Sequence, residues 1–194
     1  MESQPQARKP YPTDVTDEEW QPAAVLVAGT GRHAYYLSDQ AVVLGAAPAP
    51  SGALEIDAPA AAEPRTGQRP MDVRLLTALV NMQRGLPVLV GQDVRSFEID
   101  GCGNLTMTAG RGWKAYFGRV ITPEEFGSLS AKLAALKAVS TAQDLNSPDL
   151  LYVNLMNSAL PAVELRPKAP PPSPSPARAP APAPTALAPL VTCQ

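Results

Sequence analysis

The segment that comes nearest to a known functional motif is Gly29 to Ala34, which follows an apolar run. It matches the pattern G-x-G-x-x-A, in which glycines let backbone amides approach a pyrophosphate at the start of a helix. No helical pattern follows, because residues 33–44 hold two tyrosines and two valines around an Asp-Gln pair, which is typical of strands and a turn. We therefore expect a hairpin turn here, and no nucleotide site.

Other groups that could act in catalysis are sparse. His33 is the only histidine, so neither a histidine-paired nucleophile nor a two-histidine metal site can be assembled. The carboxylates that attract attention lie beside a turn or at a helix start, where acidic residues are ordinary: Glu98, Asp100, Glu124 and Glu125. From these residues we expect no enzyme activity, no cofactor, no metal ion and no small-molecule substrate.

The composition of the chain limits the classes of partner that it is expected to bind. The chain has 194 residues, 23 prolines, a formal net charge of -2 and a pI near 5.4. A mildly acidic chain without a Lys/Arg cluster has no general attraction to phosphate backbones, so we expect no nucleic acid partner. The two cysteines, Cys102 and Cys193, predict neither a disulfide framework nor a thiolate metal site.

Proline density divides the chain into three parts. Residues 1–22 are polar and proline-broken, which predicts a disordered leader, and residues 167–194 are rich in Pro and Ala, which predicts a disordered tail. The folded domain is expected at 23–166. No stretch has the roughly 18 to 20 apolar residues that span a bilayer, and the leader lacks an apolar core. Taken alone, the sequence predicts a cytoplasmic protein.

A helix is well marked after residue 121. Thr122, Pro123 and Glu125 form an N-cap, a first-turn proline and a capping box. The apolar stripe that follows has helical spacing and is expected to pack on a sheet: Phe126, Leu129, Leu133 and Leu136. The residues between them are expected to face water: Ser128, Lys132 and Lys137.

The rest of the domain predicts strands and one further helix. That helix is expected over residues 70–84, ended by Gly85 and Pro87. Strands are expected at 23–28, 33–38, 41–44, 54–56, 94–100, 105–109, 113–117, 152–155 and 162–165. The fold class is therefore α+β, with a mostly antiparallel curved sheet covered by two helices. The last strand, at 162–165, has no successor and is expected to be an edge, where a partner chain can add a strand.

One family is similar to the C-terminal half in the order of its elements. An aromatic strand at 113–118, a capped helix and a strand pair ending at Leu165 resemble the end of the extracytoplasmic β domain of the bacterial division family FtsQ/DivIB. The likeness begins near Pro22, includes Tyr35 to Asp39 and continues over residues 75–165. Tyr152-Val153-Asn154-Leu155-Met156 is similar to the family's Tyr-Val-Asp-Leu-Arg signature, and Phe117-Gly118 to its Leu-Gly.

The resemblance implies a non-enzymatic scaffold of the division machinery. In the family, the last strand and its surroundings bind the small division proteins FtsB and FtsL by strand addition. Carried over by position, the partner-binding residues are Tyr152, Val153, Asn154, Leu155, Asn157, Ala162, Val163, Glu164 and Leu165. Asn154 and Met156 replace the family's Asp and Arg, which removes an ion pair from that strand. Members of the family are anchored in the inner membrane by one transmembrane helix, which is followed by a POTRA domain and then by the extracytoplasmic β domain. Neither the transmembrane helix nor the POTRA domain has a counterpart in this sequence.

A second resemblance is local. Residues 8–20 are similar to the opening of insertion-sequence transposases, and the likeness ends at Gln21. None of the acidic catalytic residues of such enzymes can be placed afterwards, so the segment is interpreted as a fusion scar. The alternatives to a division scaffold are a transposase remnant and an unassigned ligand-binding α+β domain.

Overall fold

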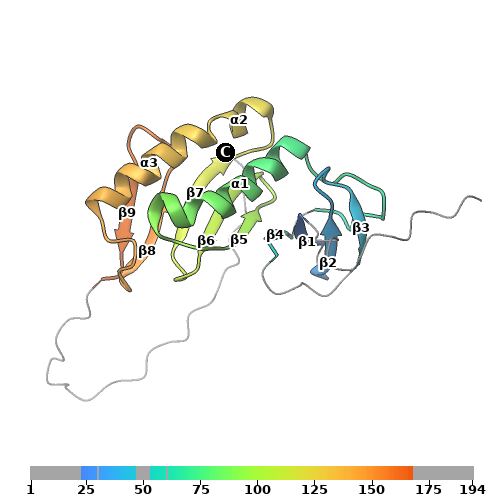
Figure 1. Cartoon of the computed structure of the whole chain (residues 1–194), viewed down its shortest axis with the longest axis horizontal. Helices are drawn as coiled ribbons and strands as arrows, with labels where there is room; N and C mark the ends of the chain where they lie inside the picture. The colour runs from blue at the N-terminus through green and yellow to red at the C-terminus, as the bar shows by residue number, and fades with distance from the viewer. Residues whose placement is uncertain (1–22, 30, 47–52, 60, 168–194) are drawn as a thin grey trace, which may run out of the picture.

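The computed structural model describes residues 23–29, 31–46, 53–59 and 61–167. Within them, the strands form one sheet in the order β3-β2-β1-β4-β5-β6-β7-β8-β9 (Figure 1). The strands are β1 (Ala24–Ala28), β2 (His33–Leu37), β3 (Val43–Ala46), β4 (Glu55–Ala58), β5 (Val94–Ile99), β6 (Asn104–Ala109), β7 (Lys114–Arg119), β8 (Leu150–Asn154) and β9 (Ala162–Leu165). The helices are α1 (Val73–Val90), α2 (Pro123–Gly127) and α3 (Leu129–Ala142).

The predicted α+β class is confirmed, and the sheet is mixed. Hairpin neighbours pair antiparallel, whereas β4 pairs parallel with both β1 and β5, and β7 pairs parallel with β8. The β4–β5 and β7–β8 connections run through α1 and through α2 and α3. Both crossovers step across the sheet in the same direction, so the handedness rule places their helices on the same face. The leader predicted at 1–22, and the tail predicted at 167–194 beyond its first residue, lie outside the described residues.

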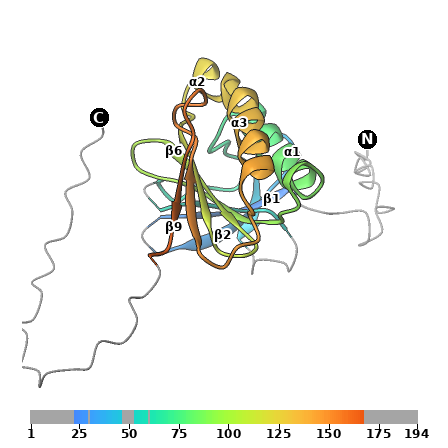
Figure 2. The same ribbon diagram turned by 90° about the vertical axis from the view of Figure 1, so that its left-hand side faces the viewer.

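The sheet therefore has a covered face and an open face. Figure 2 shows α1, α2 and α3 together on one side of the strands, and it shows β9 running across the direction of β2, so the sheet is strongly twisted. On β6, Leu105 and Met107 point to the helices and are completely buried, whereas Thr106 and Thr108 alternate with them on the open face. This alternation is the one predicted for a half-buried strand.

The predicted end of the first helix is wrong. We expected α1 to stop at Gly85 and Pro87, but it continues to Val90 and ends at Gly91, which has a left-handed backbone with φ 68°. Leu86 lies between the two stop residues and is buried in the core, and its burial outweighs the missing N–H of Pro87 in the last turns. The helix begins at Asp72, whose side chain accepts a hydrogen bond from the Arg74 N–H.

The predicted start of the second helical segment is confirmed, but the predicted burial of its side chains is partly wrong. Thr122 and Glu125 form the capping box, but Ser128 interrupts the helix between α2 and α3. Leu136 is fully buried as predicted, whereas Leu133 is only partly buried. Lys132, expected to face water, is 8 % exposed.

Lys132 is buried because it has an internal partner. Its Nζ donates to the backbone carbonyl of Phe117 at 2.5 Å, so the side-chain stem packs in the core while the ammonium satisfies a carbonyl near the end of β7. Burial lowers the pKa of Lys132 below its ordinary value, and the nearby carboxylate of Glu125 partly opposes that shift.

The β5–β6 turn contains Cys102, for which the sequence did not predict a disulfide. Asp100 organises this turn, because its carboxylate accepts from the backbone N–H groups of Cys102 and Asn104 at 2.8 Å. Cys102 is disulfide-bonded, although the number of cysteines predicted no disulfide framework. The other cysteine in the sequence, Cys193, lies outside the described residues.

Candidate partner-binding edge

β9 is the open edge of the sheet. It pairs with β8 in the antiparallel register Tyr152 to Glu164 and Val153 to Val163. On its outer side, no strand or loop among the described residues pairs with it. Its backbone groups on that side are therefore available to another chain.

The opposite edge, β3, is occupied. The N–H of Val43 donates to the carbonyl of Gln68, and the N–H of Gly67 donates to the carbonyl of Val43, both at 2.8 Å. The segment before α1 thus uses the outer backbone groups of Val43, at the start of β3. Among the described residues, the outer side of β9 has no such backbone partner.

The direction of the β9 backbone groups follows from one hydrogen bond. The N–H of Arg166 donates to the carbonyl of Asp149 at 2.6 Å, so Arg166 faces β8. Backbone groups alternate along an antiparallel strand, and the irregularity in this ladder lies in β8, between Leu150 and Tyr152. Glu164 therefore also faces β8, and Val163 and Leu165 point their N–H and C=O groups to the open edge.

Two side chains of the predicted set stabilise the edge from its open face. The hydroxyl of Tyr152 donates to the carboxylate of Glu164, and this hydrogen bond raises the pKa of Tyr152 above its ordinary value. The ring of Tyr152 meets that of Tyr116 edge to face, with centroids 5.2 Å apart. The pair fixes Glu164 on the strand that is exposed to a partner.

The predicted residues do not all reach the surface. Val153 and Leu155 are completely buried, so their side chains support the edge from within the core. Asn154 and Asn157 accept hydrogen bonds from the backbone N–H groups of Met156 and Ala159 at 3.0 Å, so both asparagines shape the β8–β9 loop. The remaining predicted residues lie at the surface or partly exposed: Tyr152, Ala162, Val163, Glu164 and Leu165.

Exposed apolar side chains flank the edge, and of these only Leu165 was among the predicted partner-binding residues. Met156 and Leu160 in the β8–β9 loop are 54 % and 76 % exposed, and Leu165 on β9 is 50 % exposed. Gly118, with φ 75°, lets this loop approach β7, because an added Cβ would lie 3.3 Å from the Met156 Cγ. Such side chains around an edge strand are typical of a protein-binding surface.

The segments whose residue types resembled chemical sites can be located in the described part of the chain. Residues 33–37 form β2 and not a helix, so the turn before them lacks the geometry of a dinucleotide site. The His33 Nε2 lies 3.5 Å from the Glu63 Oε1, on an exposed rim. No three His, Cys, Asp or Glu side chains in the described ranges gather into a group that could hold a metal ion.

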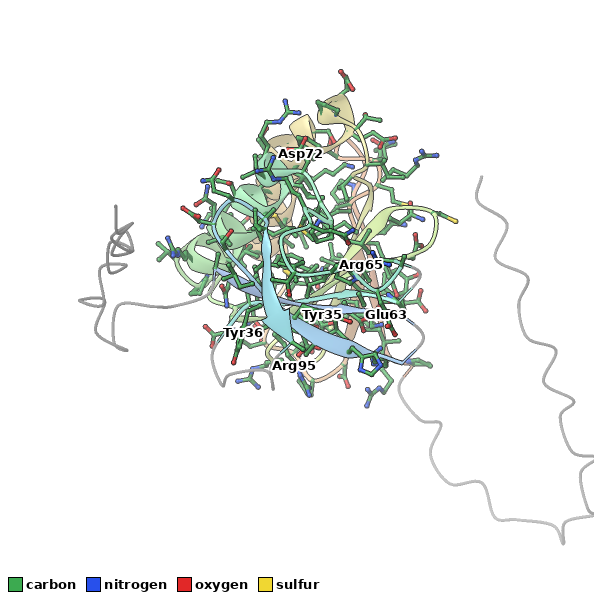
Figure 3. All side chains as sticks on the ribbon, turned by 90° about the vertical axis from the view of Figure 1, so that its right-hand side faces the viewer. Tyr35, Tyr36, Glu63, Arg65, Asp72 and Arg95 are labelled. Atoms are coloured by element: carbon green, nitrogen blue, oxygen red, sulfur yellow. The ribbon has the colours of Figure 1, made fainter. Side chains whose placement is uncertain are left out.

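A cavity of about 420 Å³ lies between the start of α1 and the β5–β6 turn. Its carboxylates, Asp72 and Asp100, already accept backbone N–H groups of their own turns. Figure 3 shows Asp72 toward the helix side of the domain, away from Tyr36 and Arg95, which do not line this cavity. The cavity therefore lacks free polar groups that would select a ligand.

In the part of the chain that the structure describes, no helix is long and apolar enough to cross a membrane. No protein-family model matches the chain, and no curated protein matches its sequence. The resemblance to the FtsQ/DivIB β domain stays a prediction from the sequence.

Proposed function

We propose that this chain is a non-enzymatic scaffold module, similar to the β domain of FtsQ/DivIB, that binds a partner division protein by strand addition along β9. The single observation that carries the proposal is that the outer side of β9 pairs with no other described residue, at the end of the sheet where the resemblance places partner binding. The backbone groups of Val163 and Leu165 supply the affinity, and the exposed apolar side chains around them supply contact area. By resemblance, the partner is an FtsB-like or FtsL-like protein.

The disulfide of Cys102 supports the compartment that goes with this function. Disulfides persist in oxidising compartments and are rare in the cytosol. An extracytoplasmic β domain, as in the family, fits this bond better than the cytoplasmic location predicted from the sequence alone.

The alternatives have less support. The transposase resemblance is confined to residues 8–20, which lie outside the described residues. A ligand-binding domain would use the cavity beside α1, where Asp72 and Asp100 are engaged in their own turns.

The test is a proline at an outward-facing position of β9. Val163→Pro removes a donor from the open edge and leaves the bonds to β8 in place, so an FtsB-like C-terminal peptide should bind at least about tenfold more weakly while the thermal midpoint changes little. Val163→Thr keeps the N–H and the β-branched shape, and should bind like the wild type. Equal binding by Val163→Pro, or no binding by the folded wild type, would contradict the proposal.

A further inference from the structure

The open side of β9 is a short window between two prolines. The outward-facing positions alternate along the chain, so they include Pro161 and Pro167 as well as Val163 and Leu165. Proline has no N–H to donate. The N–H groups that this window can donate are therefore those of Val163 and Leu165. A longer partner strand would find no N–H donor at Pro161 or at Pro167.

The side chains of this window differ on the two faces of the sheet. Val163 packs against the core on the helix side, and Leu165, in register with buried Leu150, is half exposed on the same side. Glu164 lies on the open face, where Tyr152 holds its carboxylate. A strand added here would place its side chains alternately beside the apolar residues on the helix side and beside the Glu164 carboxylate on the open face. Directly opposed Cβ atoms would lie about 4.5 to 5.5 Å apart.

We propose that the segment recognised by β9 is a short strand in which a cationic side chain, set against Glu164, is flanked on both sides by apolar residues set against Val163 and Leu165. This inference rests on the proposed strand addition and names the chemistry of the partner. Arg166 follows Glu164 on the open face, so a carboxylate is favoured opposite Arg166, two residues from the cation. Lys114 is in register with Tyr152 and lies one strand further from the edge than Tyr152, so Glu164 and Arg166 are the charges on this face that lie nearest the added strand.

A second copy of this chain fits the window poorly. Two-fold pairing centred on Val163 sets Leu165 against Pro161, and pairing centred on Leu165 sets Val163 against Pro167, so each loses donors. Pairing centred on Glu164 brings like charges face to face, which is unfavourable. The window thus favours a different chain.

The experiment uses the full chain and two strand-forming peptides of about seven residues, in which valines alternate with threonines. They differ only at the central residue, which is lysine in one and glutamate in the other. Affinities are measured at low ionic strength for the wild type, Glu164→Lys and Val163→Pro, with thermal melts to show that each variant folds.

The wild type should bind the lysine peptide about threefold to fivefold more tightly than the glutamate peptide, as for an exposed ion pair. Glu164→Lys should reverse that preference, added salt should reduce it, and Val163→Pro should weaken both peptides. Equal affinities that Glu164→Lys does not change would overturn the charge assignment, while strand addition would stand if Val163→Pro still weakened both. If Val163→Pro changed neither, or neither peptide bound the wild type, both proposals would fail. A concentration-dependent dimer that Val163→Pro dissociates would identify the partner as a second copy and overturn this inference.

Discussion

The Tyr152 hydroxyl donates to the Glu164 carboxylate, and this bond joins the last two strands on the face that the helices leave open. The bond gives a pH-dependent signal at the proposed binding surface.

The first prediction concerns the titration of Tyr152. Because the hydrogen bond to Glu164 raises the pKa of Tyr152 in the folded state, its contribution to stability is present below the unfolded value of 10.0 and is lost as pH rises through the folded pKa. Glu164→Gln removes the negative acceptor and should lower the pKa of this tyrosine. Absorbance titration of the tyrosines, with Tyr152→Phe to assign the signal, measures the change. A Tyr152 titration that Glu164→Gln leaves in place would contradict the bond.

The second prediction separates the helix residues by their burial. Leu136→Ala should lower the free energy of unfolding by about 2 to 5 kcal/mol, because Leu136 is fully buried. Leu133→Ala should cost less than Leu136→Ala, because Leu133 is only partly buried. Lys132→Ala should cost about 1 to 3 kcal/mol, since it leaves the Phe117 carbonyl without its donor. Denaturant unfolding measures all three, and a silent Lys132→Ala would show that this side chain faces water after all.

The burial of residues 113–117 and of Lys132 shows what the sequence can and cannot predict. The alternation of Trp113, Ala115 and Phe117 predicted a strand with one buried face, and all three side chains are buried. The spacing rule placed Lys132 on the wet side because it classifies a residue by its charge. It cannot know that the Phe117 carbonyl lies within reach of the ammonium, because that contact depends on how α3 packs on the sheet.

The candidate site was predictable to a similar degree. The last strand could be recognised as an edge because nothing follows it in the domain. The direction of its backbone groups could not, because that depends on the bond between Arg166 and Asp149 across the ladder. Nor could the burial of Val153 and Leu155 be separated from the exposure of Leu165 by pattern alone.

A third prediction tests a buried polar link in the core. The Gln92 side chain accepts from the Trp113 Nε1 at 3.3 Å and donates to the Asn146 Oδ1 at 2.7 Å, so it joins the segments that follow α1 and α3 to the start of β7. Gln92→Leu should destabilise the domain by about 1 to 3 kcal/mol, because the indole N–H of Trp113 is left unpaired in the core. Asn146→Ala, at an exposed residue, should cost less. Chemical denaturation followed by tryptophan fluorescence measures both, and equal costs would refute the ranking.

A fourth prediction concerns Cys102. Because Cys102 is disulfide-bonded, its sulfur should not react with a thiol reagent in the unreduced protein, even when the protein is unfolded. After reduction, the Cys102 thiol should react. Alkylation in denaturant with peptide mapping measures this, and labelling of Cys102 without a reductant would contradict the bond.

The most direct measurement is amide hydrogen exchange along β9, residue by residue, with and without an FtsB-like C-terminal peptide. In the free domain, the N–H groups of Glu164 and Arg166 should be protected by β8, whereas those of Val163 and Leu165 should exchange rapidly. Strand addition predicts that the peptide slows exchange at Val163 and Leu165 and leaves β3 unchanged. Binding without new protection at these two amides, or with protection at β3 instead, would contradict the account.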